Sequence, residues 1–271
     1  MKLSFSTLAC ADWSWDEILT AARDWGYDGI ELRLAEPHVS VEFSQEQRSE
    51  VKKKVENYGL EISCLAAYTR FHSPDPEVRA KNVEDLHSAI DLAADLGAPF
   101  VRSFGGDPRN PEPMEKVTKW ISDAFVEVDD HAQRRGIKVL LETHDILSKG
   151  KDVRAVFEHN PQITAGVVWD VKHSLVHGET LAETMDYLEG RIEHIHLKDW
   201  IQIPEQDEHL ILLGAGEMPT QDAVRKLEDI GYTGYLSLEW EKLWHPEITD
   251  SHVAIYQYAW YMKRLLADLR R

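Results

Sequence analysis

Short apolar runs alternate with longer amphipathic segments along the whole chain. The apolar runs predict eight strands, over residues 3–9, 29–34, 61–69, 100–104, 138–144, 165–173, 192–199 and 235–241. The segments between them have apolar positions at helical spacing and predict eight helices, over residues 14–26, 44–59, 75–97, 113–136, 152–160, 179–189, 220–231 and 251–270. The first helix has clear end signals, with Ser14 and Glu17 as a capping box and Gly26 as its stop.

This regular alternation of strands and helices predicts a parallel sheet. No linker or break in composition divides the chain, so residues 1–271 are predicted to form a single domain. Eight strand–helix units in about 250 residues suit a (β/α)8 TIM barrel, whose active site lies at the C-terminal ends of the strands. A doubly wound open sheet is the alternative. Its dinucleotide-binding fingerprint is missing, because "ACADWSW" follows the first strand in place of G-x-G-x-x-G.

Composition excludes several classes of partner. Hydrophobic residues make up 43% of the chain, and 48 acidic residues against 30 basic ones give a formal net charge of −18. This balance argues against nucleic acid and against an anionic membrane surface as partners. No stretch approaches the roughly 20 apolar residues of a membrane span.

The N-terminal sequence and the number of cysteines predict the cellular compartment of the protein. The N-terminal apolar run is short and contains Ser4, Ser6 and Thr7, so we interpret it as a first strand and not as a signal peptide. With only Cys10 and Cys64, a disulfide framework is not expected, which favours a cytoplasmic protein.

Ionisable residues gather where the predicted strands end. In "VVWDVKH" (167–173) an apolar run finishes with Asp170, Lys172 and His173, although burying an unpaired charge costs several kcal/mol, roughly. Side chains alternate between the two faces of a strand, so Asp170 and Lys172 are expected to share one face. In a barrel all strand ends meet at one mouth, where such charges can compensate one another.

Strands five to eight each end with a side chain that can bind a divalent metal. These four are Glu142, Asp170, His196 and Glu239. Three carboxylates and one imidazole suit Mn²⁺, Co²⁺ or Mg²⁺, and we expect Mn²⁺, with Zn²⁺ as a further alternative. Structural zinc prefers thiolates, and the chain has only two cysteines. The residues expected to balance the remaining negative charge, and to bind substrate, are Arg33, Arg102 and Lys198.

Several of these residues also have structural interpretations. Glu31 and Arg33 could form an ordinary ion pair inside the barrel. His194 shares a face with His196 but lies deeper, which favours a structural role. Glu241 and His177 are expected to be solvated.

Aromatic residues near strand ends are candidates for stacking on a sugar. They are Trp13, Trp200, Trp240 and Trp244. The alternative is packing within the barrel or at a subunit interface, so a homo-oligomer stays open. The long connection over residues 201–219 is expected to cover the site.

Six motifs resemble those of the xylose-isomerase-like TIM barrels, a superfamily of sugar and sugar-phosphate isomerases and epimerases and related lyases. They are "GYDGIELR" (26–33), "LLETH" (140–144), "WDVKH" (169–173), "HIHLKD" (194–199), "LGAGE" (213–217) and "GYTGYLSLEWE" (231–241). The resemblance covers essentially the whole chain. It is specific for the superfamily and poorly specific for substrate.

The resemblance implies roles for the residues that match these motifs. Glu142, Asp170, His196 and Glu239 match the metal ligands, and His173 matches a histidine that contacts substrate. In the ketose 3-epimerases the first and last of these Glu residues are also the acid/base pair. Those epimerases have an Arg shortly after the metal His, where this chain continues Leu-Lys-Asp-Trp. "IHLKD" looks more like the pentulose-phosphate epimerases.

The implied function is a metal-dependent isomerase or epimerase of a sugar or sugar phosphate. It would remove a proton next to a carbonyl through a metal-stabilised enediolate. One alternative is a lyase similar to 3-dehydroshikimate or inosose dehydratase, or a keto-sugar eliminase, with His144 as an acid/base candidate. Further alternatives are a nuclease resembling endonuclease IV and a non-catalytic binding module.

Overall fold

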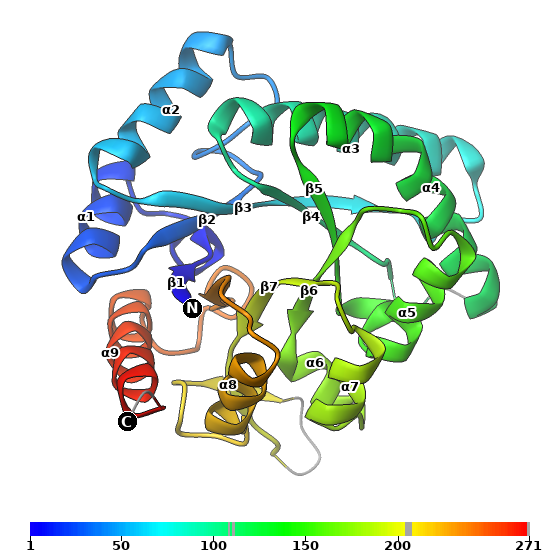
Figure 1. The fold of residues 1–271 in the computed structure, drawn as a ribbon. Coiled ribbons are helices and arrows are strands. Elements are labelled where there is room, and N and C mark those ends of the chain that lie inside the picture. The colour runs from blue at the N-terminus through cyan, green and yellow to red at the C-terminus, as the bar shows by residue number, and fades with distance from the viewer. Residues whose placement is uncertain (108, 110–111, 204–207, 270–271) are drawn as a thin grey trace.

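Eight parallel strands form one sheet that is nearly closed as a barrel (Figure 1). The structure is a computed structural model that describes residues 1–107, 109, 112–203 and 208–269. The barrel strands are β1 (Lys2–Phe5), β2 (Gly29–Arg33), β3 (Glu61–Arg70), β4 (Phe100–Phe104), β5 (Lys138–Glu142), β6 (Gly166–Asp170), β7 (Ile192–Leu197) and β10 (Tyr235–Leu238). Their order is β1-β10-β7-β6-β5-β4-β3-β2, and a bridge between Ser6 and Glu31 brings the two edges together. The TIM barrel prediction is confirmed.

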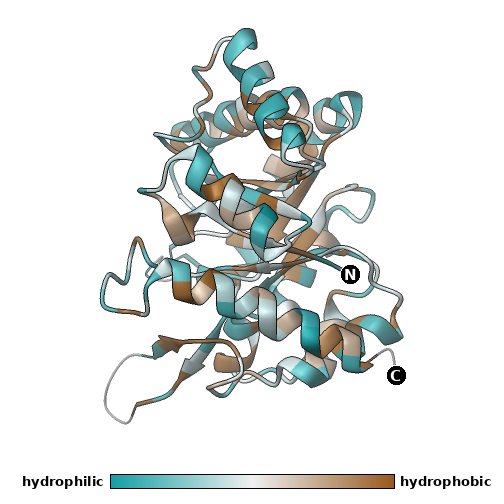
Figure 2. Cartoon of the chain, turned by 90° about the vertical axis from the view of Figure 1, so that its left-hand side faces the viewer, coloured by the Kyte–Doolittle hydropathy of each residue, from teal (hydrophilic) through white to brown (hydrophobic). Residues whose placement is uncertain are grey.

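Helices cover the outside of the barrel (Figure 1). They are α1 (Trp15–Trp25), α2 (Gln45–Asn57), α3 (Pro76–Leu96), α4 (Met114–Arg135), α5 (Gly150–His159), α6 (Val171–Val176), α7 (Leu181–Tyr187), α8 (Thr220–Asp229) and α9 (Ser251–Leu269). The predicted capping box of α1 is present: the Ser14 hydroxyl accepts from the Glu17 amide, and the Glu17 carboxylate accepts from the Ser14 amide. Hydrophobic residues gather on the strands, while the helices are mixed in character (Figure 2). Within the described ranges, no helix has the length and apolar character needed to cross a bilayer.

Strand six ends earlier than its sequence predicts. The predicted strand reached residue 173, whereas β6 stops at Asp170 and α6 begins at Val171. The Asp170 carboxylate is the N-cap of α6 and accepts a long hydrogen bond, 3.4 Å, from the His173 amide. The expectation that Asp170 and Lys172 share a strand face is therefore wrong, because Lys172 lies in the helix.

Five other predicted strands are also shorter in the structure, two of them slightly: β2 ends at Arg33 instead of residue 34, and β5 ends at Glu142 instead of residue 144. β1 ends at Phe5, and a 3₁₀ helix, Thr7–Cys10, follows where the strand was expected to continue. β7 ends at Leu197, and β10 ends at Leu238, just before the predicted ligand Glu239.

The long connection after β7 contains a small hairpin that was not predicted. β8 (Asp199–Ile201) pairs antiparallel with β9 (His209–Ile211). Residues 204–207 of the expected covering segment, and residue 270 of the last predicted helix, lie outside the described residues.

Asp199 anchors the rest of this connection. Its buried carboxylate accepts hydrogen bonds from four backbone amides, those of Trp200, Gly214, Gly216 and Met218, at 2.8–3.0 Å. Gly216 is required by close approach, since a Cβ there would lie 2.2 Å from the Trp200 carbonyl oxygen. One side chain thus holds the segment after β9 against β8.

Asp199→Asn is expected to lower the free energy of unfolding by about 1–3 kcal/mol, because an amide nitrogen replaces one accepting oxygen and leaves buried N–H groups unpaired. Urea unfolding followed by circular dichroism measures this loss. Asp229→Asn, at an exposed position of α8, is the matched control and should stay within about 0.5 kcal/mol of the parent. Equal stability of the two variants would contradict the anchoring role.

Candidate functional site

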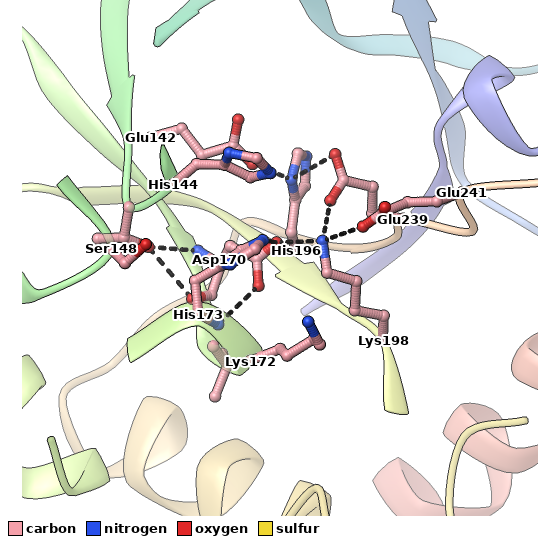
Figure 3. Close-up of polar contacts among 12 residues, drawn as sticks. Glu142, His144, Ser148, Asp170, Lys172, His173, His196, Lys198, Glu239 and Glu241 are labelled. Atoms are coloured by element: carbon pink, nitrogen blue, oxygen red, sulfur yellow. Dashed lines mark hydrogen bonds and ion pairs between the residues drawn. The ribbon is translucent and has the colours of Figure 1, made fainter. Parts of the chain in front are cut away.

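The four predicted metal ligands lie together at the C-terminal mouth of the barrel (Figure 3). Glu142 and Asp170 are the last residues of β5 and β6, His196 lies near the end of β7, and Glu239 directly follows β10. One ligand atom from each lies within 4.8 Å of those of the other three, and all four side chains are buried. We call these four residues the quartet.

The His196 ring is the centre of the quartet. Its Nδ1 lies 2.8 Å from Glu142 Oε1 and 3.4 Å from Glu239 Oε1. Its Nε2 points the other way and lies 2.9 Å from Glu31 Oε2. Asp170 is the register partner of His196 across β6 and β7, which places its carboxylate beside the ring.

Lys198 connects the quartet to a further carboxylate. Its Nζ lies 2.7 Å from Asp170 Oδ2, 2.5 Å from Glu239 Oε2 and 2.7 Å from Glu241 Oε1 (Figure 3). Burial lowers the pKa of the Lys198 ammonium, but the three carboxylates outweigh this and hold the pKa well above its usual value. The ammonium therefore stays charged at neutral pH.

Glu241 corrects one expectation. It was expected to be solvated, but its carboxylate is mostly buried against Lys198. In the predicted strand over residues 235–241, alternation puts Glu241 on the same side as Glu239, and this is the signal that could have identified it, although β10 itself ends at Leu238.

Arg102 contacts Glu142 through Oε2, the carboxylate oxygen that does not contact His196. Its guanidinium is 3.3 Å from Glu142 Oε2 and lies over the rings of Phe104 and Tyr68, at 3.8 and 5.5 Å from their centroids. These two rings at the mouth were not identified from the sequence.

The two glutamates of the quartet differ in proton affinity. Burial raises the pKa of Glu142, but the positive charges of Arg102 and His196 outweigh this effect and lower the pKa to about 2. Burial raises the pKa of Glu239, and Lys198 and His196 only partly offset this. Burial also lowers the pKa of His196, but Glu31, Glu239 and Glu142 together raise it well above the ordinary value.

The quartet fits a divalent cation. Asp170 Oδ2 is buried and contacts Lys198 Nζ at 2.7 Å and His173 Nε2 at 3.7 Å. Glu142 Oε2 is a buried atom that has no hydrogen bond within the described residues, only an ion-pair contact with Arg102 at 3.3 Å. Buried acceptors of this kind normally have a hydrogen-bond partner or an ion. Oxygen-rich donor sets with one imidazole suit Mn²⁺, Co²⁺ or Mg²⁺.

Two histidines border the quartet. The rings of His144 and His173 lie 4.1 Å apart between centroids, and His173 Nε2 lies 3.7 Å from Asp170 Oδ2. His144 Nδ1 lies 2.9 Å from the carboxylate of Asp145, a residue with a backbone φ of 53° that is unfavourable for an L-residue. Burial, His144 and Lys198 together hold the pKa of His173 well below its usual value, so its ring is neutral.

No contact with a quartet residue is described for three other residues that were predicted to bind substrate. Arg33 ends β2 and is partly exposed, and Trp200 is buried in β8. Trp13 packs against the rings of Trp25 and His252, as its packing alternative predicted.

Glu31 is paired differently from the expectation. Its carboxylate accepts from His194 at 2.8 Å and from His196 at 2.9 Å, so the expected ion pair with Arg33 is replaced by contacts to β7. His194 is fully buried, as its structural interpretation requires. His177 is exposed, as expected.

Residues 19–257 match the family model described as the xylose isomerase-like TIM barrel, which is most of the chain. The chain belongs to this family. Its relatives include sugar epimerases: a fructoselysine 3-epimerase of Shigella flexneri is 22% identical over 232 residues, covering 80% of this chain and 82% of its own.

Solved structures show the same fold. An L-ribulose 3-epimerase superposes with a TM-score of 0.83 at 20% identity, covering 100% of this chain and 96% of its own. The IOLI protein with a bound zinc atom also gives a TM-score of 0.83, at 18% identity, and covers 99% of both chains.

Proposed function

We propose that this protein is a divalent-metal-dependent epimerase or isomerase of a ketose or ketose phosphate, with Mn²⁺ as its ion. The observation that carries the proposal is the quartet, in which three carboxylates and one imidazole converge at the mouth of the barrel. The sugar epimerases among the relatives support the choice of substrate class.

The ion would be held by Glu142, Asp170, His196 and Glu239. When bound, a divalent ion supplies Lewis-acid stabilisation of negative charge on substrate oxygens. Lys198 and Arg102 add two fixed positive charges beside the quartet carboxylates. Together they favour a substrate whose oxygens become negatively charged during the reaction.

Glu142 and Glu239 are the proposed proton-transfer residues. They come from β5 and from the end of β10, two strands separated in the sheet by β6 and β7. Their carboxylates both reach His196 Nδ1, so they meet at one place from different sides of the mouth. A 3-epimerase removes a proton from one face of a planar intermediate and returns one to the other face. Two carboxylates can do this, whereas one alone would return the proton to the same side.

The histidine pair supports a second candidate, a lyase that expels a β-substituent after the same proton abstraction. His144 and His173 lie side by side next to Asp170, and His173 Nε2 is a buried atom with no hydrogen bond among the described residues. Such a nitrogen is available to a substrate hydroxyl. The lyase would use His144 as its acid or base.

Metal dependence gives the first test. Chelator-stripped protein should interconvert no ketose, and Mn²⁺ or Co²⁺ should restore activity on a panel of pentuloses, hexuloses and their phosphates. At about 100 times its dissociation constant, a bound ion should raise the free energy of unfolding by about 2.7 kcal/mol. Ca²⁺ at the same concentration controls for ionic strength. Full activity of the stripped protein would contradict the proposal.

A further inference from the structure

Glu31 lies beneath the quartet, inside the barrel. A single oxygen, Oε2, contacts three possible donors: His194 Nε2 at 2.8 Å, His196 Nε2 at 2.9 Å and Ser237 Oγ at 3.1 Å. All four residues are buried and come from three strands, β2, β7 and β10.

These contacts determine where the His196 proton lies. An ionised carboxylate only accepts hydrogen bonds, so Nε2 of His196 must carry the proton that it shares with Glu31. Nδ1 lies 2.8 Å from Glu142 Oε1, so it carries a second proton as long as no ion is bound, and a divalent ion held by the quartet would replace that proton and use the Nδ1 lone pair. This Nδ1 is the atom that faces Glu142 and Glu239.

We propose that Glu31 is a positioning residue that holds His196 as its Nε2–H tautomer, so that Nδ1 is presented to the divalent ion. The inference rests on the metal site of the proposed function. Glu31 is not a catalytic residue, because the His196 ring lies between its carboxylate and the glutamates of the quartet. A carboxylate behind a metal-binding histidine orients the ring and increases its basicity, and losing such a partner typically costs 10–100-fold in metal affinity, roughly.

A second ion is the competing interpretation of the same residues. Glu31, His194 and His196 also have ligand atoms close enough to hold a metal. An ion there would take the place of the proton on His196 Nε2, and the ring would then bridge two ions through both nitrogens. The tautomer proposal predicts one ion per chain, and the bridging arrangement predicts two.

Two variants at this cluster separate positioning from general support of the fold. Glu31→Gln keeps the shape of the side chain but removes its charge, and the new amide can donate to His196 Nε2 and favour the wrong tautomer. Ser237→Ala is the matched control, because it removes a contact to the same oxygen and leaves Glu31 and both histidines in place. We expect Mn²⁺ affinity, measured by competition with a fluorescent chelator, to fall about 10–100-fold in Glu31→Gln and less than about threefold in Ser237→Ala.

The wild-type protein gives a readout that needs no variant at Glu31. In Zn²⁺-loaded protein with ¹⁵N-labelled histidine, long-range ¹H–¹⁵N spectra should show His196 with its proton on Nε2 and its metal on Nδ1. The His196 signal is assigned by its loss in His196→Gln.

Each outcome decides the inference. A wild-type protein that binds one ion, with the expected tautomer and the expected loss in Glu31→Gln, supports it. An ion bound through Nε2, two ions per chain, or an unchanged affinity in Glu31→Gln would overturn it and leave the proposed function standing. A wild-type protein that binds no divalent ion would overturn both.

Discussion

Asp170→Ala should reduce the divalent ion held at saturation from one per chain to less than about one-tenth, and turnover should fall to the background rate. The variant removes one of the three quartet carboxylates, and it leaves the Lys198 ammonium with one partner fewer beside the site. The Lys198 ammonium, no longer neutralised by Asp170, then repels the cation at the position where the Asp170 carboxylate attracted it. Equilibrium dialysis with Mn²⁺, followed by elemental analysis, measures the occupancy.

Part of any loss at this position is structural, because Asp170 is also the N-cap of α6. Removing the cap costs about 1 kcal/mol of stability. Asp222→Ala, in the exposed first turn of α8, is the control for loss of a carboxylate near a helix start. Near-ultraviolet circular dichroism shows that each variant is folded. Full occupancy in folded Asp170→Ala would contradict the ligand assignment.

Glu142→Gln and Glu239→Gln are each expected to lower turnover by at least about 100-fold, at the lower range for lost general acid–base catalysis. Glutamine keeps the length of the side chain but cannot take up the substrate proton. Since both residues are also proposed ligands, metal content is measured in parallel and rates are compared per bound ion.

Glu241→Gln is the matched control for these two variants. Glu241 contacts the same Lys198 ammonium but lies outside the quartet, so its loss should lower turnover less than about tenfold. If all three variants lose turnover equally per bound ion, the cluster acts through its overall charge, and the assignment of proton transfer to Glu142 and Glu239 is wrong.

The barrel was predictable from the sequence because each strand–helix unit has a strong local pattern. Apolar runs of strand length alternate with amphipathic segments, and the ends of α1 are marked by Ser14 and Gly26. The quartet was predictable for a related reason. In a parallel barrel all C-terminal strand ends meet, so Glu142 and Glu239 converge although they lie far apart in the chain.

The remaining errors have different physical causes. β6 ends at Asp170 because that carboxylate caps the next helix, and alternation alone cannot show where a strand gives way to a helix. The partners of Glu31 come from β7, so they follow from sheet order and register, while the sequence offers only its near neighbour Arg33. The β8–β9 hairpin has strands too short to give a periodic signal.

Proton exchange tests the central claim most directly. Mn²⁺-loaded protein is incubated in D₂O with each of the pentuloses and hexuloses, free and phosphorylated, and the products are analysed by mass spectrometry and NMR. The proposed mechanism predicts deuterium at the carbon beside the carbonyl of the interconverted ketose, with no loss of water from the sugar. In Glu142→Gln or Glu239→Gln it predicts loss of epimer formation, since the remaining carboxylate can return a proton or deuteron only to the face from which it removed one. An unsaturated product lighter by one water, with His144→Ala as the most damaging change, would contradict the epimerase and favour the lyase. Absence of deuterium from every ketose of the panel would contradict both.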